Sequence, residues 1–377
     1  MDTGEGEKTV KDKEIAIIGG GPAGLAASIE AAKAGAKVLV IDENKKIGGQ
    51  LFKQIHKFFG SHAHNAGVRG INITSRLLEE AQKLGVEIWC DSAVIGLFSE
   101  KTLAVVRDMG QKKVTLTVKA QKMLIATGAS ENAINFPGWT LPGVMGAGAA
   151  QTMINVERVL PGKRVLMVGS GNVGLIVTYQ LLQAGAEVVG IVEAMNRIGG
   201  YGVHAAKVSR AGVPFYLGHT IIRADGNHNG VNRAVISEID ENWKPKVNTE
   251  KEFQADTVCI AAGLRPLSEL ARMYDLKHTY IPELGGWVPI HNENMEASVS
   301  GVYVAGDASG VEEANTAMDE GRLAGVDMAQ SLGYLDKETG EALKAEIRSR
   351  LETLRQGPFG EKRLLAKKKI VEKGYAI

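Results

Sequence analysis

The 377-residue chain contains only two cysteines, Cys90 and Cys259, and neither belongs to a C-x-x-C or C-x4-C pair. Small secreted domains are held together by several disulfides, so a disulfide framework is excluded. A two-electron dithiol relay needs two neighbouring thiols, and that chemistry is excluded as well. Both cysteines lie in strand-like apolar runs, and we expect them to be inert, packed thiols.

Long apolar runs and an excess of one charge are also missing. No stretch approaches the ~18 apolar residues of a membrane-spanning helix, and residues 1–14 are polar and mixed in charge, unlike a signal peptide. The 44 basic and 43 acidic residues leave a net charge of +1, without a nucleic-acid-binding motif. His62 and His64 have no convincing third ligand, so no metal is expected. The sequence predicts a cytoplasmic protein with no transmembrane segment and no nucleic-acid partner.

Glycine is abundant, with 46 residues, and some of it forms the same motif twice. Each copy is an apolar strand that breaks into G-x-G-x-x-G and then opens a helix, first over residues 15–24 and again over residues 165–174. In this context the motif is typical of a turn that binds a dinucleotide pyrophosphate. Two copies predict two dinucleotides in one chain.

The first motif predicts the roles of individual residues. Gly19 permits the tight turn, Gly21 lets a pyrophosphate approach the backbone, and Gly24 lets the helix pack close to the strand. A helix over residues 22–34 would direct its free N–H groups at the phosphates. The strand over residues 38–41 ends at an acid that is expected to accept from a ribose hydroxyl. The predicted contacts are Gly19, Gly21, Pro22, Ala23, Gly24, Asp42 and Glu43.

The second motif repeats this logic, with a helix over residues 173–184 and a strand over residues 188–192 that ends at Glu193. A carboxylate at this position would bind an unmodified ribose and repel a 2′-phosphate, which favours NADH over NADPH. Arg197 could accommodate the phosphate, so NADPH stays open. The predicted contacts are Gly169, Gly171, Asn172, Val173, Gly174 and Glu193.

Three further apolar strands order the rest of the chain. Each half closes with a strand that ends in glycine, over residues 123–128 and 258–263. A third strand over residues 301–307 ends in Gly306-Asp307 and precedes a helix over residues 312–330. The chain is therefore expected to return to its first domain after completing the second. Hairpin turns are expected near residues 108–110, 225–227 and 229–230.

Taken in order, the segments GGGPAG, VIDENKKIGGQL, IATGAS, GSGNVG, AAGLRP and VYVAGDAS resemble those of the two-dinucleotide flavoproteins, the pyridine nucleotide–disulfide oxidoreductase-like superfamily, over residues 13–335. The resemblance implies FAD in the first site and NAD(P)H in the second. It implies that Asp307 accepts from the ribityl chain or nearby FAD oxygens. It adds as FAD contacts Gly48, Gly49, Gln50, Thr127, Gly128, Gly306, Asp307, Thr316 and Ala317, and as NAD contacts Ala262 and Gly263.

The expected fold class is α/β, with two Rossmann-like, GR2-type three-layer ββα domains, the NAD domain being inserted in a discontinuous FAD domain. We expect a flexible tail over residues 1–12 and an NAD(P)H-binding domain over residues 132–265. The FAD-binding domain would span residues 13–131 and 266–335. Residues 336–377 would form a C-terminal helix and basic tail.

Two stretches, residues 49–60 and 310–325, resemble the FAD/NAD subunits of heteromeric amine and amino-acid dehydrogenases, such as hydrogen cyanide synthase, opine oxidase, dye-linked proline dehydrogenase and multisubunit sarcosine oxidase. The resemblance implies an NAD(H)-linked FAD oxidoreductase in a hetero-oligomer, where a sister flavoprotein subunit oxidises the amine. Two alternatives stay open. One is a free-standing NADH:acceptor oxidoreductase that reduces quinone, dye or oxygen. The other is a structural flavin-containing subunit without turnover.

Two smaller features complete the predictions. Lys53 and His56 follow the flavin-contacting glycines and are candidates for tuning the flavin ring or guiding an acceptor. In the tail, helical spacing of apolar residues predicts a helix, followed by a basic run over residues 362–369. This tail either packs on its own domain with a solvated basic end or docks a sister subunit. The apolar residues are Leu343, Ile347, Leu351 and Leu354.

Overall fold

The computed structural model describes residues 10–58, 60–110, 112–357 and 360–374, so residues 1–9 of the predicted tail lie outside the described residues. The chain forms two compact units. Unit 1 comprises Met1–Ser130 and Arg265–Ile377, and unit 2 comprises Glu131–Leu264. The chain passes from one unit to the other at β7 (Ala129–Glu131) and returns at β16 (Leu264–Pro266), and these two strands pair.

Unit 1 is built on a parallel sheet with the order β3-β2-β1-β6-β19. The long strand β6 also pairs with β5, and β5 with β4, to form an antiparallel meander. Ile15 and Ile17 of β1 face a core shared with helices, whereas Ala16 and Ile18 face a core shared with the meander. This alternation gives the unit three layers. The strands are β1 (Val10–Ile18), β2 (Val38–Ile41), β3 (Glu87–Trp89), β4 (Ser92–Phe98), β5 (Thr102–Asp108), β6 (Lys113–Ile125) and β19 (Val302–Val304).

The predicted tail boundary needs a correction. Strand β1 begins at Val10, and Val10–Asp12 pair with residues 117–119 of β6. These three residues belong to the sheet because β6 is long enough to offer them backbone partners.

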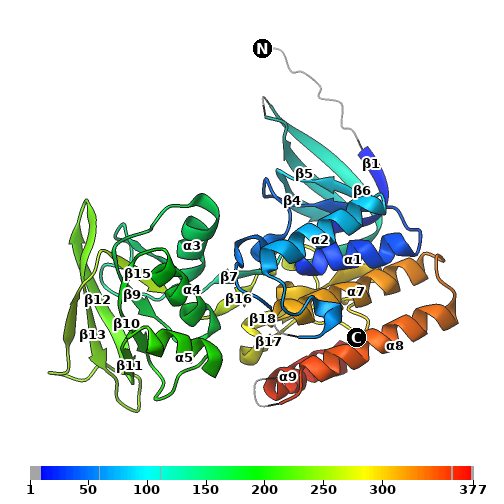
Figure 1. The fold of residues 1–377 in the computed structure, drawn as a ribbon. Helices are drawn as coiled ribbons and strands as arrows, with labels where there is room; N and C mark the ends of the chain where they lie inside the picture. The colour runs from blue at the N-terminus through cyan, green and yellow to red at the C-terminus, as the bar shows by residue number, and fades with distance from the viewer. Residues whose placement is uncertain (1–9, 59, 111, 358–359, 375–377) are drawn as a thin grey trace. The chain divides into compact units, whose positions relative to one another are not determined.

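The helices α1 (Pro22–Lys33) and α7 (Ala314–Ser331) lie side by side in unit 1, although nearly 300 residues separate them (Figure 1). Their backbones approach closely because Gly321 and Gly325 carry no side chain. A Cβ at either position would overlap the carbonyl oxygen of Ala23 or Ala27 in α1. The contact aligns the first turn of α1 with the first turns of α7. Further helical elements of this unit are α2 (Gly70–Lys83), α6 (Glu269–Met273), η1 (Gly49–Lys53), η2 (His62–His64), η4 (Pro282–Leu284) and η5 (Gly306–Ser309).

The C-terminal segment folds as two helices of unit 1, α8 (Lys337–Leu354) and α9 (Glu361–Gly374). Helix α8 packs along α7 and buries Ile347 and Leu351 of the predicted apolar stripe. Helix α9 buries Ala366 and Ile370 in a small apolar cluster with residues of β17 (His278–Ile281), η4 and β18 (Gly286–Pro289). The prediction of a solvated basic end is wrong at one residue, because Lys367 is only 4 % exposed.

Unit 2 repeats the design with a five-stranded parallel sheet in the order β11-β10-β9-β15-β8 and a separate antiparallel sheet, β12-β13-β14. Val165 and Met167 of β9 face the helices, and Leu166 and Val168 face the antiparallel sheet. The elements are β8 (Val144–Gly146), α3 (Ala147–Thr152), the π-helix η3 (Met153–Glu157), β9 (Arg164–Val168), α4 (Asn172–Gln183), β10 (Glu187–Glu193), α5 (Gly202–Arg210), β11 (Phe215–Leu217), β12 (His219–Asn227), β13 (Gly230–Glu238), β14 (Lys251–Gln254) and β15 (Thr257–Ile260).

One turn predicted in unit 2 is wrong. Residues 225–227 continue β12, whose register with β13 shifts between Asp225 and Gly226. The glycine serves a bulge, and the chain reverses between Asn227 and Gly230. No helix in the described part of the chain is both long and apolar enough to cross a membrane.

Candidate functional site

The turn after β1 contains three glycines, and neighbouring atoms exclude a side chain at two of them. Gly19 has φ +101°, and a Cβ there would overlap the carbonyl oxygen of Ala126. A Cβ at Gly24 would overlap the carbonyl oxygen of Gly19. At Gly21, by contrast, the nearest described atom to a Cβ would be the Gly49 Cα, at 3.8 Å. Packing therefore explains Gly19 and Gly24 but not Gly21, which fits a backbone that a ligand approaches.

Helix α1 begins directly after Gly21. Its first residue is Pro22, no described side chain caps the helix, and no acid stands in its first turn. The N–H groups of a first helical turn have no partner within the helix, and the helix dipole adds partial positive charge there. This end of α1 suits a phosphate.

Two other segments lie against this turn. A Cβ at Gly49 would come within 2.8 Å of the Gly21 Cα, and one at Gly306 within 2.9 Å of the Ala23 Cβ. The Gly48 N–H donates to the Gly20 carbonyl oxygen at 2.9 Å. The structure thus brings together the predicted FAD contacts Gly19, Gly21, Pro22, Ala23, Gly24, Gly48, Gly49, Thr127, Gly306 and Ala317. Their contact with FAD stays a prediction.

The structure also shows the surroundings of the Thr127 side chain and of the other predicted residues of this site. Gln50 is exposed, and the Thr127 hydroxyl donates to the Leu267 carbonyl oxygen at 2.6 Å. Gly128 follows with φ +80°. Lys53 ends η1, which begins at Gly49, and the His56 ring stacks on Phe58 with centroids 5.4 Å apart. The influence of Lys53 and His56 on a flavin stays a prediction.

The acid at the end of β2 contacts the glycine turn itself. The buried Asp42 carboxylate accepts from the Gly20 N–H at 2.7 Å and from the Asn44 N–H at 2.8 Å. Glu43 is exposed. The Asp42 Oδ1 also accepts from the Asn44 side-chain amide at 3.0 Å. Oδ2 accepts only from Gly20 among the described residues and retains a lone pair, so the predicted bond from Asp42 to a ribose is compatible with these contacts.

The Gly306-Asp307 pair lies on η5, before helix α7, which begins at Ala314 rather than at residue 312. The N–H of Glu312 donates to the Asp307 carboxylate at 3.3 Å. Burial, with the neighbouring glutamates 312, 313 and 320, raises the pKa of Asp307 to about 7. The Thr316 hydroxyl donates to the Glu313 carbonyl oxygen at 2.6 Å, and no described side chain caps the N-terminus of α7.

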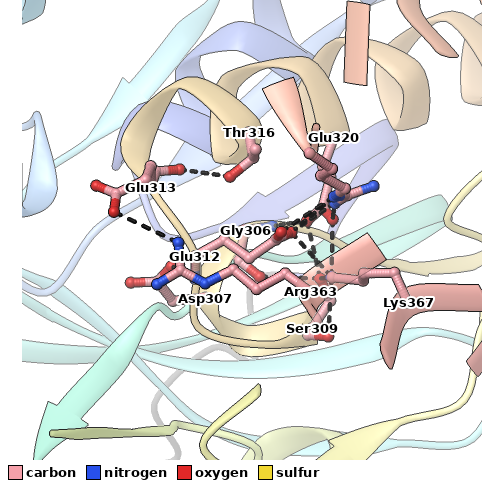
Figure 2. Close-up of polar contacts among 10 residues, drawn as sticks. Gly306, Asp307, Ser309, Glu312, Glu313, Thr316, Glu320, Arg363 and Lys367 are labelled. Atoms are coloured by element: carbon pink, nitrogen blue, oxygen red, sulfur yellow. Dashed lines mark hydrogen bonds and ion pairs between the residues drawn. The ribbon is translucent and has the colours of Figure 1, made fainter. Parts of the chain in front are cut away.

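Beside η5 lies a buried ion cluster, defined here as Glu312, Glu320, Arg355 and Lys367. Figure 2 labels Glu312, Glu320 and Lys367. Glu320 is 2 % exposed, and its carboxylate accepts from the Gly306 N–H at 3.0 Å and from Lys367 Nζ at 2.7 Å. Burial alone would raise the pKa of Glu320, but Lys367 and Arg355 outweigh it and lower the pKa to about 2. The sequence analysis missed this cluster. No local signal marks Glu320, because it stands between two other charged residues of α7, Asp319 and Arg322.

The glycine turn of unit 2 shows the same division of roles. A Cβ at Gly169 would overlap the Ala261 carbonyl oxygen, and one at Gly174 the Gly169 carbonyl oxygen. A Cβ at Gly171 would have no described atom within 4 Å. Helix α4 begins after Gly171, with no cap from a described side chain and no acid in its first turn. Again packing does not require the middle glycine.

Glu193, the acid at the end of β10, has a carboxylate that is held by hydrogen bonds. Its carboxylate accepts from the Ser170 hydroxyl at 2.6 Å and from the Met195 N–H at 2.9 Å. The Asn172 carboxamide oxygen accepts from the Tyr201 N–H at 2.8 Å, which ties the start of α4 to the loop after Glu193. Of the other predicted contacts, Val173, Ala262 and Gly263 are exposed.

The cysteines lie in different units. Cys259 is fully buried in β15 of unit 2, and burial raises the pKa of its thiol to about 12. Cys90, in unit 1, follows β3, and burial raises the pKa of its thiol as well. High thiol pKa values oppose the thiolate that redox chemistry needs. Among the described residues, no group of three or more His, Cys, Asp and Glu is placed to hold a metal.

Two dinucleotide-type turns on parallel sheets indicate the class of oxidoreductases that bind two nucleotides. A comparison with protein families agrees: the model described as pyridine nucleotide-disulphide oxidoreductase matches residues 13–321. The chain belongs to this family and is an FAD-dependent oxidoreductase, of a kind that binds FAD and NAD(P).

Comparisons with individual proteins find relatives that are named as particular enzymes or enzyme subunits. The chain is 27 % identical over 368 residues to hydrogen cyanide synthase subunit HcnB of Pseudomonas aeruginosa, covering 92 % of this chain and 77 % of the relative. It is 29 % identical over 343 residues to an opine oxidase subunit of Rhizobium meliloti, covering 84 % and 71 %. The L-proline dehydrogenase of P. horikoshii has a similar fold, with a TM-score of 0.68 at 23 % identity. This match covers 92 % of the present chain but only 60 % of that protein.

Proposed function

We propose that this chain is the electron-transfer subunit of a heteromeric amine or amino-acid dehydrogenase, passing electrons between NADH, FAD and a partner flavoprotein subunit. FAD would lie in unit 1 and the nicotinamide nucleotide in unit 2. The observation that carries the proposal is that Gly21 and Gly171 have room for a Cβ among the described atoms. A ligand accounts for both glycines.

The residues of unit 1 fit FAD. Free N–H groups of α1 would bind its pyrophosphate, Asp42 would orient its ribose, and Asp307 would meet the ribityl chain. Bound FAD would supply two-electron chemistry with a nicotinamide. The protein's part is then to hold both coenzymes in place and to exclude water, since hydride transfer itself needs no protein acid or base.

The choice of NADH rests on Glu193. Its carboxylate, fixed by Ser170 and Met195, would accept from the adenosine ribose hydroxyls and repel a 2′-phosphate. The nearby Arg197 is exposed. We expect Glu193→Ala to reduce NADH affinity at least tenfold and to narrow the preference over NADPH. Glu187→Ala, at the opposite end of β10 and paired on the surface with Arg164, is the matched control.

The partner is supported by the relatives, two of which are named as subunits. The test has two parts. Purified chain should contain FAD that NADH reduces anaerobically, and native-mass measurement in extracts of the source cells should find the chain in a larger assembly containing a second flavoprotein. Bound flavin that NADH fails to reduce would contradict the electron-transfer role. Rapid turnover of the lone chain with a quinone, and no associated subunit, would favour a free-standing NADH:acceptor oxidoreductase.

A further inference from the structure

The segment η5, which carries Gly306 and Asp307, is held by side chains that come from the end of the chain. Lys367 Nζ in α9 donates to the Ser309 carbonyl oxygen at 3.1 Å and lies 2.9 Å from the Ser309 hydroxyl oxygen. The same ammonium lies 2.7 Å from the Glu320 carboxylate, which accepts from the Gly306 N–H. One lysine therefore fixes both ends of η5, directly at Ser309 and through Glu320 at Gly306 (Figure 2).

The burial of Lys367 needs an explanation, because a buried ammonium loses several kcal/mol of hydration. Its neighbours in the basic run, Lys368 and Lys369, are exposed, as is usual for lysine. Arg355 already pairs with Glu312, through Nε at 3.0 and 3.2 Å, and with Glu320 at 2.6 Å. Lys367 thus adds a second cation against two buried glutamates, at 2.7 Å from Glu320 and 3.9 Å from Glu312.

The contact of Lys367 with η5 adds to a second restriction, which acts at the first residue of η5. Gly306 has φ +68°, and the α1 side chain of Ala23 limits the space on one side of it. The bonds to the Gly306 N–H and the Ser309 carbonyl oxygen restrict the backbone that carries Asp307, and the Glu312 N–H donates to the Asp307 carboxylate at 3.3 Å. A segment fixed before a ligand arrives does not have to be ordered on binding, and affinity rises accordingly.

We propose that Lys367 is a positioning residue for FAD: through Ser309 and Glu320 it holds η5 in the conformation that presents Asp307, so that helix α9 determines how tightly the cofactor is retained. The proposal rests on the assignment of FAD to unit 1. It gives the C-terminal helices a role inside their own unit.

The test compares Lys367→Met with the exposed control Lys368→Met. FAD is titrated into each apoprotein, the melting temperature of each apoprotein is measured, and the flavin midpoint potential is determined in each reconstituted holoprotein. Lys367→Met is expected to raise the FAD dissociation constant about tenfold or more. It should also lower the midpoint potential, because removal of a cation leaves more negative charge in unit 1 and disfavours the extra electrons on the flavin. Lys368→Met should leave both quantities as in the wild type.

The outcomes separate the possible roles. A lower melting temperature with unchanged FAD affinity and potential would make Lys367 a purely structural residue and overturn the proposal. If Lys367→Met does not fold, Ser309→Ala removes one anchored hydroxyl and retains every charge. It should weaken FAD binding several-fold, and unchanged binding would overturn the proposal equally. A wild-type chain that binds no FAD would instead refute the assignment of the first site.

Discussion

Gly171 offers the sharpest test of the second nucleotide site, because its replacement by alanine separates folding from binding. The residue is the N-cap of α4 with φ −66° and ψ 176°, an extended conformation that alanine adopts freely. No described atom lies within 4 Å of the added Cβ. Loss of the preferred N-cap glycine costs a few tenths to about 1 kcal/mol, and the reduced entropy of the unfolded chain returns a similar amount. We expect Gly171→Ala to change the free energy of unfolding by less than about 1 kcal/mol.

Binding should respond very differently. The new methyl group would occupy the space from which a pyrophosphate contacts the first turn of α4, so one or two charge-assisted hydrogen bonds, each about 1.5–3 kcal/mol, would be lost. A loss of about 3 kcal/mol raises the NADH dissociation constant roughly 100-fold. Calorimetric titration of NADH and thermal melting measure the two effects, and retained FAD in unit 1 serves as an internal control.

Gly174→Ala is the contrasting variant. Its Cβ would overlap the Gly169 carbonyl oxygen in the packed contact between α4 and β9, and the clash should destabilise unit 2 by about 3 kcal/mol or more. If Gly171→Ala binds NADH as tightly as the wild type, the pyrophosphate does not lie on this turn. The reasoning from glycine contacts would then be refuted for unit 2.

Three further predictions concern single groups. Because the pKa of Asp307 is raised to about 7, the folded apoprotein binds a proton that the unfolded chain releases near pH 4. Stability should therefore fall as pH rises from about 4 to 7, and this loss should be absent from Asp307→Asn in melting curves across that range. Asp319→Asn should destabilise unit 1 by about 3 kcal/mol in denaturant titrations at neutral pH. The reason is that the buried Asp319 carboxylate accepts from His64 Nε2 at 2.8 Å and from Arg322 at 2.6 Å. An unchanged unfolding midpoint would refute this prediction. Replacing both cysteines by alanine should leave the rate of flavin reduction by NADH unchanged. It should remove about 1–2 kcal/mol of stability, because the packing of the buried Cys259 and of the half-buried Cys90 is lost. A slower rate in stopped-flow traces would show that a thiol takes part.

The parts of the fold that the sequence predicts well are those that depend on neighbouring residues. The helix predicted over 22–34 is observed as Pro22–Lys33, and that predicted over 173–184 as Asn172–Gln183. In both cases the preceding glycine turn and the apolar residues of the segment itself indicate where the helix lies. The strand over residues 38–41 is observed with the predicted bounds.

The parts that escaped prediction depend on contacts between distant residues. Nothing around Lys367 distinguishes it from Lys368, and its burial follows from Glu320, 47 positions earlier, and from Ser309, 58 positions earlier. Likewise, the acids 42 and 193 were predicted from their spacing to the glycines, but their bonds to the turn backbone depend on how the loops after β2 and β10 fold back. Local pattern predicts which residues lie on the glycine turns, whereas the side-chain contacts beside those turns and beside η5 depend on residues far away in the sequence.

The interruption of unit 1 by unit 2 has a consequence for biosynthesis. A ribosome releases the complete 131–264 segment before it has made β19, which pairs with β6, or α7, which packs on α1. Domains generally fold as units while they are synthesised. Unit 2 can therefore fold on the nascent chain before β19 is available to pair with β6. If FAD binds to unit 1 as proposed, it would bind only after β19, η5 and α7 have been synthesised.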